Sequence, residues 1–137
     1  AKRLLLEGEQ LVNIADAINK NEFDFSVQNG EKVGFVFPVY FYTVPSIVEK
    51  FISKLNLNGA DYVYAVITCG GSIGQAGSVL KKLLKNRNVN LNFVAPLLMP
   101  DNSMLFYQIP PVTAAKKQLN AAEILLKDIK LKIRKSL

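Results

Sequence analysis

The chain has 137 residues, half of them hydrophobic, and a formal net charge of +6, which predicts one compact domain over residues 1–137 with a buried core. With Cys69 as the single cysteine and no histidine, the chain excludes disulfide frameworks, the usual Cys/His zinc sites and His-based nucleophilic triads, so its chemistry has to come from a cofactor. No apolar run approaches the roughly 20 residues of a membrane-spanning helix and no secretory signal is visible, so we expect a cytoplasmic protein without a membrane partner, as one unpaired thiol also indicates.

The positive charge is concentrated towards the C-terminus. Residues 114–137 contain seven basic and two acidic residues, a net charge of +5, and the remainder of the chain is nearly neutral. No basic patch is interleaved with aromatic residues, which disfavours nucleic acid as a partner. We interpret the excess as a solvated helix face whose cations lie near the negative end of the helix dipole.

The first third of the chain predicts one clear strand. Residues 1–6 are rich in helix formers and are followed by Gly8, which indicates the end of a helix. Gln10–Ile14 is a short strand candidate, and a polar, Asn-rich stretch follows over residues 19–31. Lys32–Pro38 is apolar without alternation and closes on a proline, which is typical of a central parallel strand covered on both faces.

Helices and strands alternate in the remainder. Apolar spacing predicts a helix over Val44–Leu55 with Thr43 as a candidate N-cap. Tyr62–Cys69 is rich in β-branched and aromatic residues and predicts a second buried strand. The apolar stripe over residues 76–84 predicts another helix, and Ser72 with Gln75 has the spacing of a capping box.

The last two predicted elements are a strand and a long helix. Leu91–Met99 is the strand, and Pro96 inside it indicates an edge position. The helix runs from Thr113 onward, and the residues expected on its inward face are Leu119, Ala122, Leu126, Ile129 and Ile133. Alternating strands and helices imply an α/β fold, a doubly wound parallel sheet with helices on both faces. Ligands of such sheets bind beyond the carboxyl ends of the strands.

Two loops follow predicted strands and carry unusual composition. Residues 38–45 (PVYFYTVP) hold three consecutive aromatic residues, which either offer exposed rings for stacking or cover the neighbouring helix; the loop alone supports both interpretations equally. Residues 68–77 (TCGGSIGQAG) hold four glycines that allow a ligand close to the backbone. Their spacing differs from G-x-G-x-x-G, which disfavours a nicotinamide dinucleotide fold.

Single residues in these loops have ordinary interpretations as well. Cys69 is either a redox-sensitive thiol beside a ligand or a packed small residue, and the second is favoured. Asp101 and Asn102, in the loop after the last strand, have the composition of an Asx turn. No acid–base pair is evident in that loop.

Three segments together resemble a known family. Gly34–Leu55 (GFVFPVYFYTVPSIVEKFISKL), Tyr62–Ala76 (YVYAVITCGGSIGQA) and Met99–Asn102 (MPDN) are similar to the flavodoxin-like domains of bacterial and archaeal proteins, which often join a flavodoxin domain to a ferredoxin domain. The resemblance implies a flavodoxin-like sheet with strand order 2-1-3-4-5. We expect its strand 1 and phosphate loop to be missing from this sequence, and that strand to belong between Gln10–Ile14 and Lys32–Pro38.

The resemblance also implies the cofactor FMN, bound over the carboxyl edge of the sheet. It implies no catalytic side chain and no metal ligand, and Tyr40 is the candidate for stacking on the flavin ring. The residues implied to bind FMN are Pro38, Val39, Tyr40 and Phe41 on one side of the ring, Thr68, Cys69, Gly70 and Gly71 on the other, and Gly74 in the same loop.

The leading functional hypothesis is an FMN-binding electron-transfer protein whose partner is a redox protein such as a ferredoxin domain or a reductase. An enzyme, an FMN-dependent NAD(P)H or quinone oxidoreductase, is the alternative; it needs an open pocket above the flavin, which the crowded loop at residues 38–45 disfavours. A non-redox interaction module with a vestigial flavin site is the third hypothesis. The sequence leaves the oligomeric state open.

Overall fold

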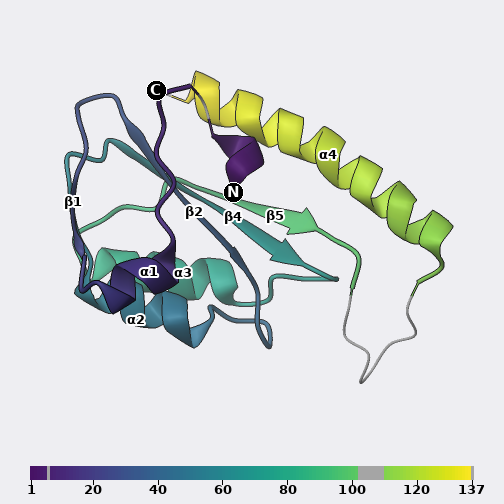
Figure 1. Ribbon diagram of the computed structural model, residues 1–137, viewed down its shortest axis with the longest axis horizontal. Helices are drawn as coiled ribbons and strands as arrows, with labels where there is room; N and C mark the ends of the chain where they lie inside the picture. The colour runs from purple at the N-terminus through teal and green to yellow at the C-terminus, as the bar shows by residue number, and fades with distance from the viewer. Residues whose placement is uncertain (6, 102–109, 137) are drawn as a thin grey trace.

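The fold is an α/β domain with parallel strands in two sheets. The structure is a computed structural model that describes residues 1–5, 7–101 and 110–136. In chain order the elements are η1 (Lys2–Leu4), α1 (Ile14–Asn19), β1 (Asp24–Ser26), β2 (Lys32–Pro38), α2 (Ser46–Lys54), β3 (Asn56–Asn58), β4 (Tyr62–Cys69), α3 (Ala76–Lys85), β5 (Phe93–Leu98) and α4 (Val112–Lys135) (Figure 1).

The larger sheet places three carboxyl ends at one edge. Its order is β2-β4-β5, all parallel, while β1 and β3 form a separate two-stranded parallel sheet. Pro38 at the end of β2 is in register with Thr68, and Leu98 at the end of β5 is in register with Cys69. The loops that follow these strands therefore start side by side.

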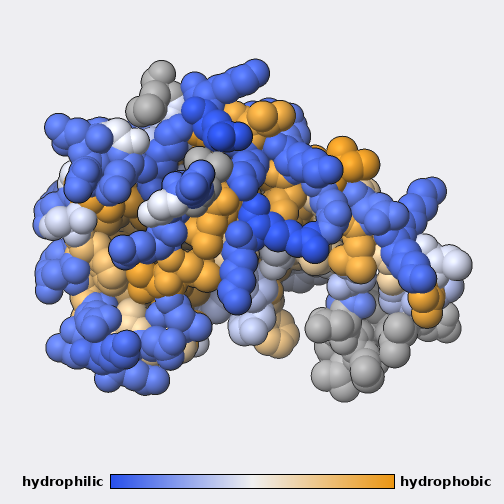
Figure 2. All heavy atoms as spheres, turned by 45° about the horizontal axis from the view of Figure 1, so that its top comes forward, coloured by the Kyte–Doolittle hydropathy of each residue, from blue (hydrophilic) through white to orange (hydrophobic). Residues whose placement is uncertain are grey.

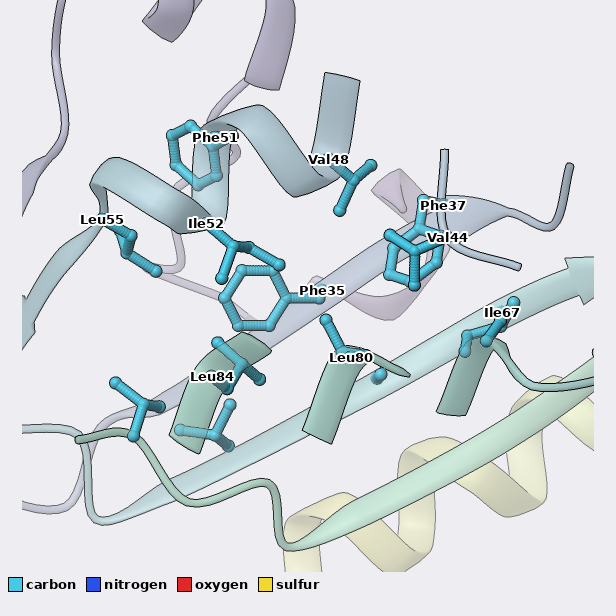
Figure 3. Close-up of a cluster of buried hydrophobic side chains, with 14 of the residues drawn as sticks. Phe35, Phe37, Val44, Val48, Phe51, Ile52, Leu55, Ile67, Leu80 and Leu84 are labelled. Atoms are coloured by element: carbon cyan, nitrogen blue, oxygen red, sulfur yellow. The ribbon is translucent and has the colours of Figure 1, made fainter. Parts of the chain in front are cut away.

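The strands form because both of their faces are covered. Val63, Ala65 and Ile67 of β4 point into a core with α1, α2 and α3, whereas Tyr64 and Val66 of β4 point into a second core with α4 and the N-terminal residues. Figure 3 shows the first core, where side chains of β2 and β4 meet those of α2 and α3; the labelled residues are Phe35, Phe37, Val44, Val48, Phe51, Ile52, Leu55, Ile67, Leu80 and Leu84.

The strand predictions from Lys32 onward agree with the structure. Lys32–Pro38 and Tyr62–Cys69 are strands with the predicted bounds, and a strand lies within Leu91–Met99 with Pro96 exposed in it. Within the described residues β5 pairs only with β4, as its predicted edge position requires. β2 likewise pairs only with β4 there, so β4 holds the central position that was predicted for Lys32–Pro38.

The predicted strand at Gln10–Ile14 is wrong. Ile14 opens helix α1, because the Asn13 side chain accepts hydrogen bonds from the backbone N–H groups of Ala15 (2.9 Å) and Asp16 (3.2 Å) and so caps the helix. Leu11 and Val12, the apolar residues that indicated a strand, are about half exposed. Residues 10–13 belong to no strand, so Gln10–Ile14 is not strand 2 of the expected order, and the predicted position of a missing strand between Gln10–Ile14 and Lys32–Pro38 is wrong as well.

Two predicted caps are also wrong. Helix α2 starts at Ser46, and Pro45, which precedes it, takes the cap position assigned to Thr43. In α3 no side chain caps the first turn; the Ser72 hydroxyl instead accepts from the Gly74 N–H at 3.1 Å. At the N-terminus the predicted helix end is a short 3₁₀ turn over Lys2–Leu4.

The C-terminal helix packs as its spacing predicted. Ala122, Ile129 and Ile133 are buried and Leu126 packs against the same core, but Leu119 is 43% exposed. Within the described ranges, no helix has the length and apolarity needed to cross a membrane.

Candidate functional site

A tight hairpin extends the carboxyl end of β2. Val39 N–H donates to Thr68 O at 2.9 Å, which continues the ladder with β4 by one residue. Tyr40 and Thr43 then exchange two backbone hydrogen bonds of 3.0 and 3.1 Å. The two residues between them, Phe41 and Tyr42, have φ values of 47° and 61°, the left-handed conformation of a two-residue turn that normally selects Asn-Gly.

This turn presents its aromatic rings to solvent. Tyr40 is 60% exposed, Tyr42 62% and Phe41 96%. Phe41 therefore covers no neighbouring helix, while Tyr40 and Tyr42 are partly covered. That these rings stack on a ligand stays a prediction. A left-handed φ costs a non-glycine residue roughly 1–2 kcal/mol, so the loop holds its aromatics outward in a locally strained backbone.

The hairpin is joined to the glycine-rich loop after β4. Tyr42 O accepts from Gln75 N–H at 2.8 Å. Gly74 has a φ of +53°, and a Cβ on it would lie 2.5 Å from Tyr42 Cβ and 2.6 Å from Tyr42 O. Gly74 is thus the residue that lets the two loops touch. The sequence indicated a close backbone approach in this loop, although the partner at Gly74 is Tyr42.

The other two candidate glycines differ from each other. A Cβ on Gly70 would lie 2.9 Å from Asp101 Cγ, so the bare backbone of Gly70 allows the loop after β5 to approach. Among residues 1–5, 7–101 and 110–136, a Cβ on Gly71 would meet nothing within 4 Å, and Gly71 is not in the left-handed region. Within these ranges no atom therefore covers the backbone of Gly71 on the side where a Cβ would project.

Cys69 contributes its backbone to the site and its thiol to the interior. Cys69 O accepts from Met99 N–H at 2.8 Å, and Met99 O accepts from the Gln118 side chain of α4 at 3.0 Å. The Cys69 side chain is 5% exposed, and burial raises the pKa of its thiol above the ordinary value. The thiol is therefore packed and protonated at neutral pH, as the favoured interpretation of this residue had it.

Three loops meet at the carboxyl edge as a result. The structure brings Pro38, Val39 and Thr68 together through the β2–β4 register, and Gly74 reaches them through Tyr42. Asp101 lies against Gly70, while Asn102 is outside the described residues. The sequence analysis did not identify Gln75 as the residue that holds the hairpin, because its hydrogen bond to Tyr42 is made by backbone atoms that nearly every residue type has.

Two hollows flank this edge. One of about 570 Å³ lies between the sheet and α4 and is lined by Thr68, Val66, Leu97 and Leu119 among others. The second, an open groove of about 500 Å³, lies beside Gly74 and Gly77 and extends to Lys81 of α3 and Pro96 of β5. The first hollow thus borders the carboxyl edge at Thr68, and the second borders the glycine-rich loop at Gly74.

Comparison of the chain with protein-family models, curated protein sequences and solved structures gives no match. The function has to be inferred from the site itself.

Proposed function

We propose that this protein binds FMN at the carboxyl edge of β2, β4 and β5 and carries electrons. The observation that supports this most is the pairing of exposed aromatic rings at Tyr40 and Phe41 with an open glycine backbone at Gly71. A flat aromatic cofactor gains from stacking on a ring, and its polar edge gains from backbone N–H groups that it can approach closely. The two features lie on loops that a hydrogen bond holds together.

The residues present fit the ring portion of FMN. Pro38, Val39, Tyr40 and Phe41 would line one side of it, and Thr68, Cys69, Gly70 and Gly71 the other. In the described part of the chain, the Gly71 N–H donates to no backbone carbonyl, and in this proposal it would bond a flavin heteroatom. Cys69 would take part only through its backbone, since its thiol is buried.

Bound FMN supplies the electron-accepting chemistry, and the protein supplies position and environment. Tyr40 would exclude water from one face of the ring, and the strained turn at Phe41 and Tyr42 would fix the height of that platform. Backbone groups of residues 68–71 would set the polarity around the ring's edge. No side chain of the chain is assigned a proton transfer.

The sheet supports a flavodoxin-like arrangement. The order β2-β4-β5 is the order of strands 3, 4 and 5 in the sequence 2-1-3-4-5. In that arrangement a further parallel strand would pair with the side of β2 that carries no strand among the described residues. We include this strand order in the proposal.

The test is a titration of the purified protein with FMN, followed by flavin fluorescence and absorbance. The proposal expects a 1:1 complex with quenched fluorescence and chemical reduction of the bound flavin. It also expects no turnover of NAD(P)H with a quinone acceptor. Such turnover would favour the alternative hypothesis, an FMN-dependent oxidoreductase. Absence of flavin binding would favour the third hypothesis, a non-redox interaction module.

A pair of variants assigns the binding to the hairpin. Tyr40→Leu should lower the affinities for FMN and for riboflavin by the same factor, because Tyr40 would contact the ring that both ligands share. Tyr42→Leu is the matched control, since Tyr42 lies in the same turn with nearly equal exposure, 62% against 60%. Equal losses from the two variants would contradict the role given to Tyr40.

A further inference from the structure

Helix α4 carries a row of residues on the side opposite to its buried face. Ala122, Ile129 and Ile133 are its buried residues. At 100° per residue, the positions facing away from them recur at alternating spacings of three and four residues. This outward row consists of Thr113, Lys117, Asn120, Ile124, Lys127, Leu131 and Lys135.

Two exposed aliphatic residues lie in the middle of the outward row, with Lys127 between them. Ile124 is 70% exposed and Leu131 51%, and these two residues are seven apart, so they lie on one side of the helix two turns from each other. In Figure 2, which turns the top of the molecule forward, apolar surface appears between hydrophilic side chains on this part of the protein. Exposed aliphatic surface is unfavourable in water, so this pair is a candidate contact site for another protein.

Three lysines share the outward row with that pair: Lys127 lies between Ile124 and Leu131, and Lys117 and Lys135 lie on either side of them along the helix. The two acidic residues of α4 are engaged elsewhere: Glu123 pairs with Arg3, and Asp128 pairs with Lys132 at 3.0 Å. Among the described residues, Lys117, Lys127 and Lys135 take part in no ion pair. The outward row therefore combines two exposed aliphatic residues with uncompensated positive charge.

We propose that the outward row of α4 is a docking surface for an acidic amphipathic helix of another protein. Spacings of three and four residues let two helices pack side by side. Aliphatic residues of the partner would cover Ile124 and Leu131, and its carboxylates would lie against Lys117, Lys127 and Lys135. Protein interfaces commonly combine apolar contacts with charged ones, as this row of aliphatic and lysine side chains would. The proposal does not depend on FMN binding.

The charges and the spacing disfavour other occupants. A second copy of the chain would bring two rows of net positive charge together, and like charges across an interface are unfavourable. A membrane surface requires a broad apolar helix face, whereas Asn120 and Lys127 interrupt this one. Nucleic acid binds through its phosphates, which gives no role to the exposed aliphatic pair Ile124 and Leu131.

The experiment uses the full chain and a synthetic helical peptide about three heptads long. The peptide has leucine at the a and d positions and glutamate at e and g, so that its own charges oppose self-association. A matched peptide carries lysine in place of glutamate. Two protein variants are compared with the wild type: Lys117→Glu/Lys127→Glu/Lys135→Glu, and Ile124→Asp/Leu131→Asp. Circular dichroism and thermal unfolding check that both variants fold.

The wild type should bind the acidic peptide at least about tenfold more tightly than the basic one. The triple variant should reverse that preference, the double variant should bind neither, and FMN affinity should be the same in all three proteins. Equal affinity for the two peptides, or an unchanged preference in the triple variant, would overturn the proposal. Tighter binding to phosphatidylglycerol vesicles or to duplex DNA, abolished by the triple variant, would overturn it as well.

Discussion

Replacing Gly74 by alanine should destabilise the protein through one identified contact. The added Cβ would lie 2.5 Å from Tyr42 Cβ and 2.6 Å from Tyr42 O, closer than non-bonded atoms approach. Tyr42 cannot retreat freely, because its carbonyl accepts the Gln75 N–H at 2.8 Å and its own backbone belongs to the hairpin turn. The clash therefore has to separate the two loops.

The magnitude follows from two contributions. Placing alanine at the φ of +53° that Gly74 adopts costs roughly 1–2 kcal/mol. Loss of the hydrogen bond between Tyr42 and Gln75 adds about 0.5–1.5 kcal/mol. We expect Gly74→Ala to lower the free energy of unfolding by about 2–3 kcal/mol, which for a chain of this size lowers the Tm by about 8–12 °C.

The assay is urea unfolding followed by circular dichroism, with Gly71→Ala as the matched control. Gly71 lies three residues away in the same loop, but its Cβ would meet no described residue within 4 Å and its φ is not left-handed. The control should change stability by less than about 0.5 kcal/mol. Equal effects of the two substitutions would refute the contact between Gly74 and Tyr42 as the reason.

Three further predictions concern the same edge. Tyr40→Leu should weaken FMN binding by about threefold to tenfold, the range of an aromatic stacking contact of about 0.5–1.5 kcal/mol, measured by fluorescence titration; an unchanged dissociation constant would exclude stacking. Phe41→Asn/Tyr42→Gly supplies the residues that this turn prefers, so it should raise the free energy of unfolding by about 1 kcal/mol in urea titrations while weakening flavin binding, and a destabilised variant would contradict the turn geometry. Burial raises the pKa of the Cys69 thiol above its ordinary value of 9.0, so its contribution to stability is complete below pH 9 and is lost as the pH rises through the folded-state pKa; Cys69→Ala should flatten the fall of Tm above pH 9, and an identical slope would contradict this assignment.

The elements that could be predicted from the sequence are those with a clear residue pattern, either an unbroken apolar run or apolar residues at helical spacing. Tyr62–Cys69 is an unbroken apolar run because both faces of β4 are covered, so composition and burial agree there. The helix at residues 46–54 follows from apolar residues at helical spacing. The strand prediction at Gln10–Ile14 was wrong because the Asn13 side chain caps a helix there. The two apolar residues before it give no indication of that cap.

Short elements could not be found from the pattern. β1 and β3 have three residues each and are largely polar, so neither gives an alternation signal. They pair with each other across 32 residues of chain, from Asp24 to Asn56. That pairing depends on where α2 and β2 place the two segments, which is a property of tertiary structure.

The candidate site was predicted in location but not in its internal contacts. The ends of the predicted strands and the composition of the loops identified the loops after Pro38 and Cys69 as candidate binding loops. The two-residue turn at Phe41 and Tyr42 could not be predicted, because aromatic residues there oppose the Asn-Gly preference of the turn. The glycines looked equivalent in sequence, and only their neighbours distinguish the crowded Gly74 from the open Gly71.

The central proposal, that FMN binds at the edge where these loops meet, is tested most directly by nuclear magnetic resonance. Backbone amide resonances of the isotopically labelled protein would be followed during titration with FMN. The proposal predicts a saturable response at 1:1 stoichiometry, centred on residues 39–41 and 68–71, with α4 beyond Gln118 unaffected. No response, or a response centred on α4 or on the N-terminal residues, would contradict it.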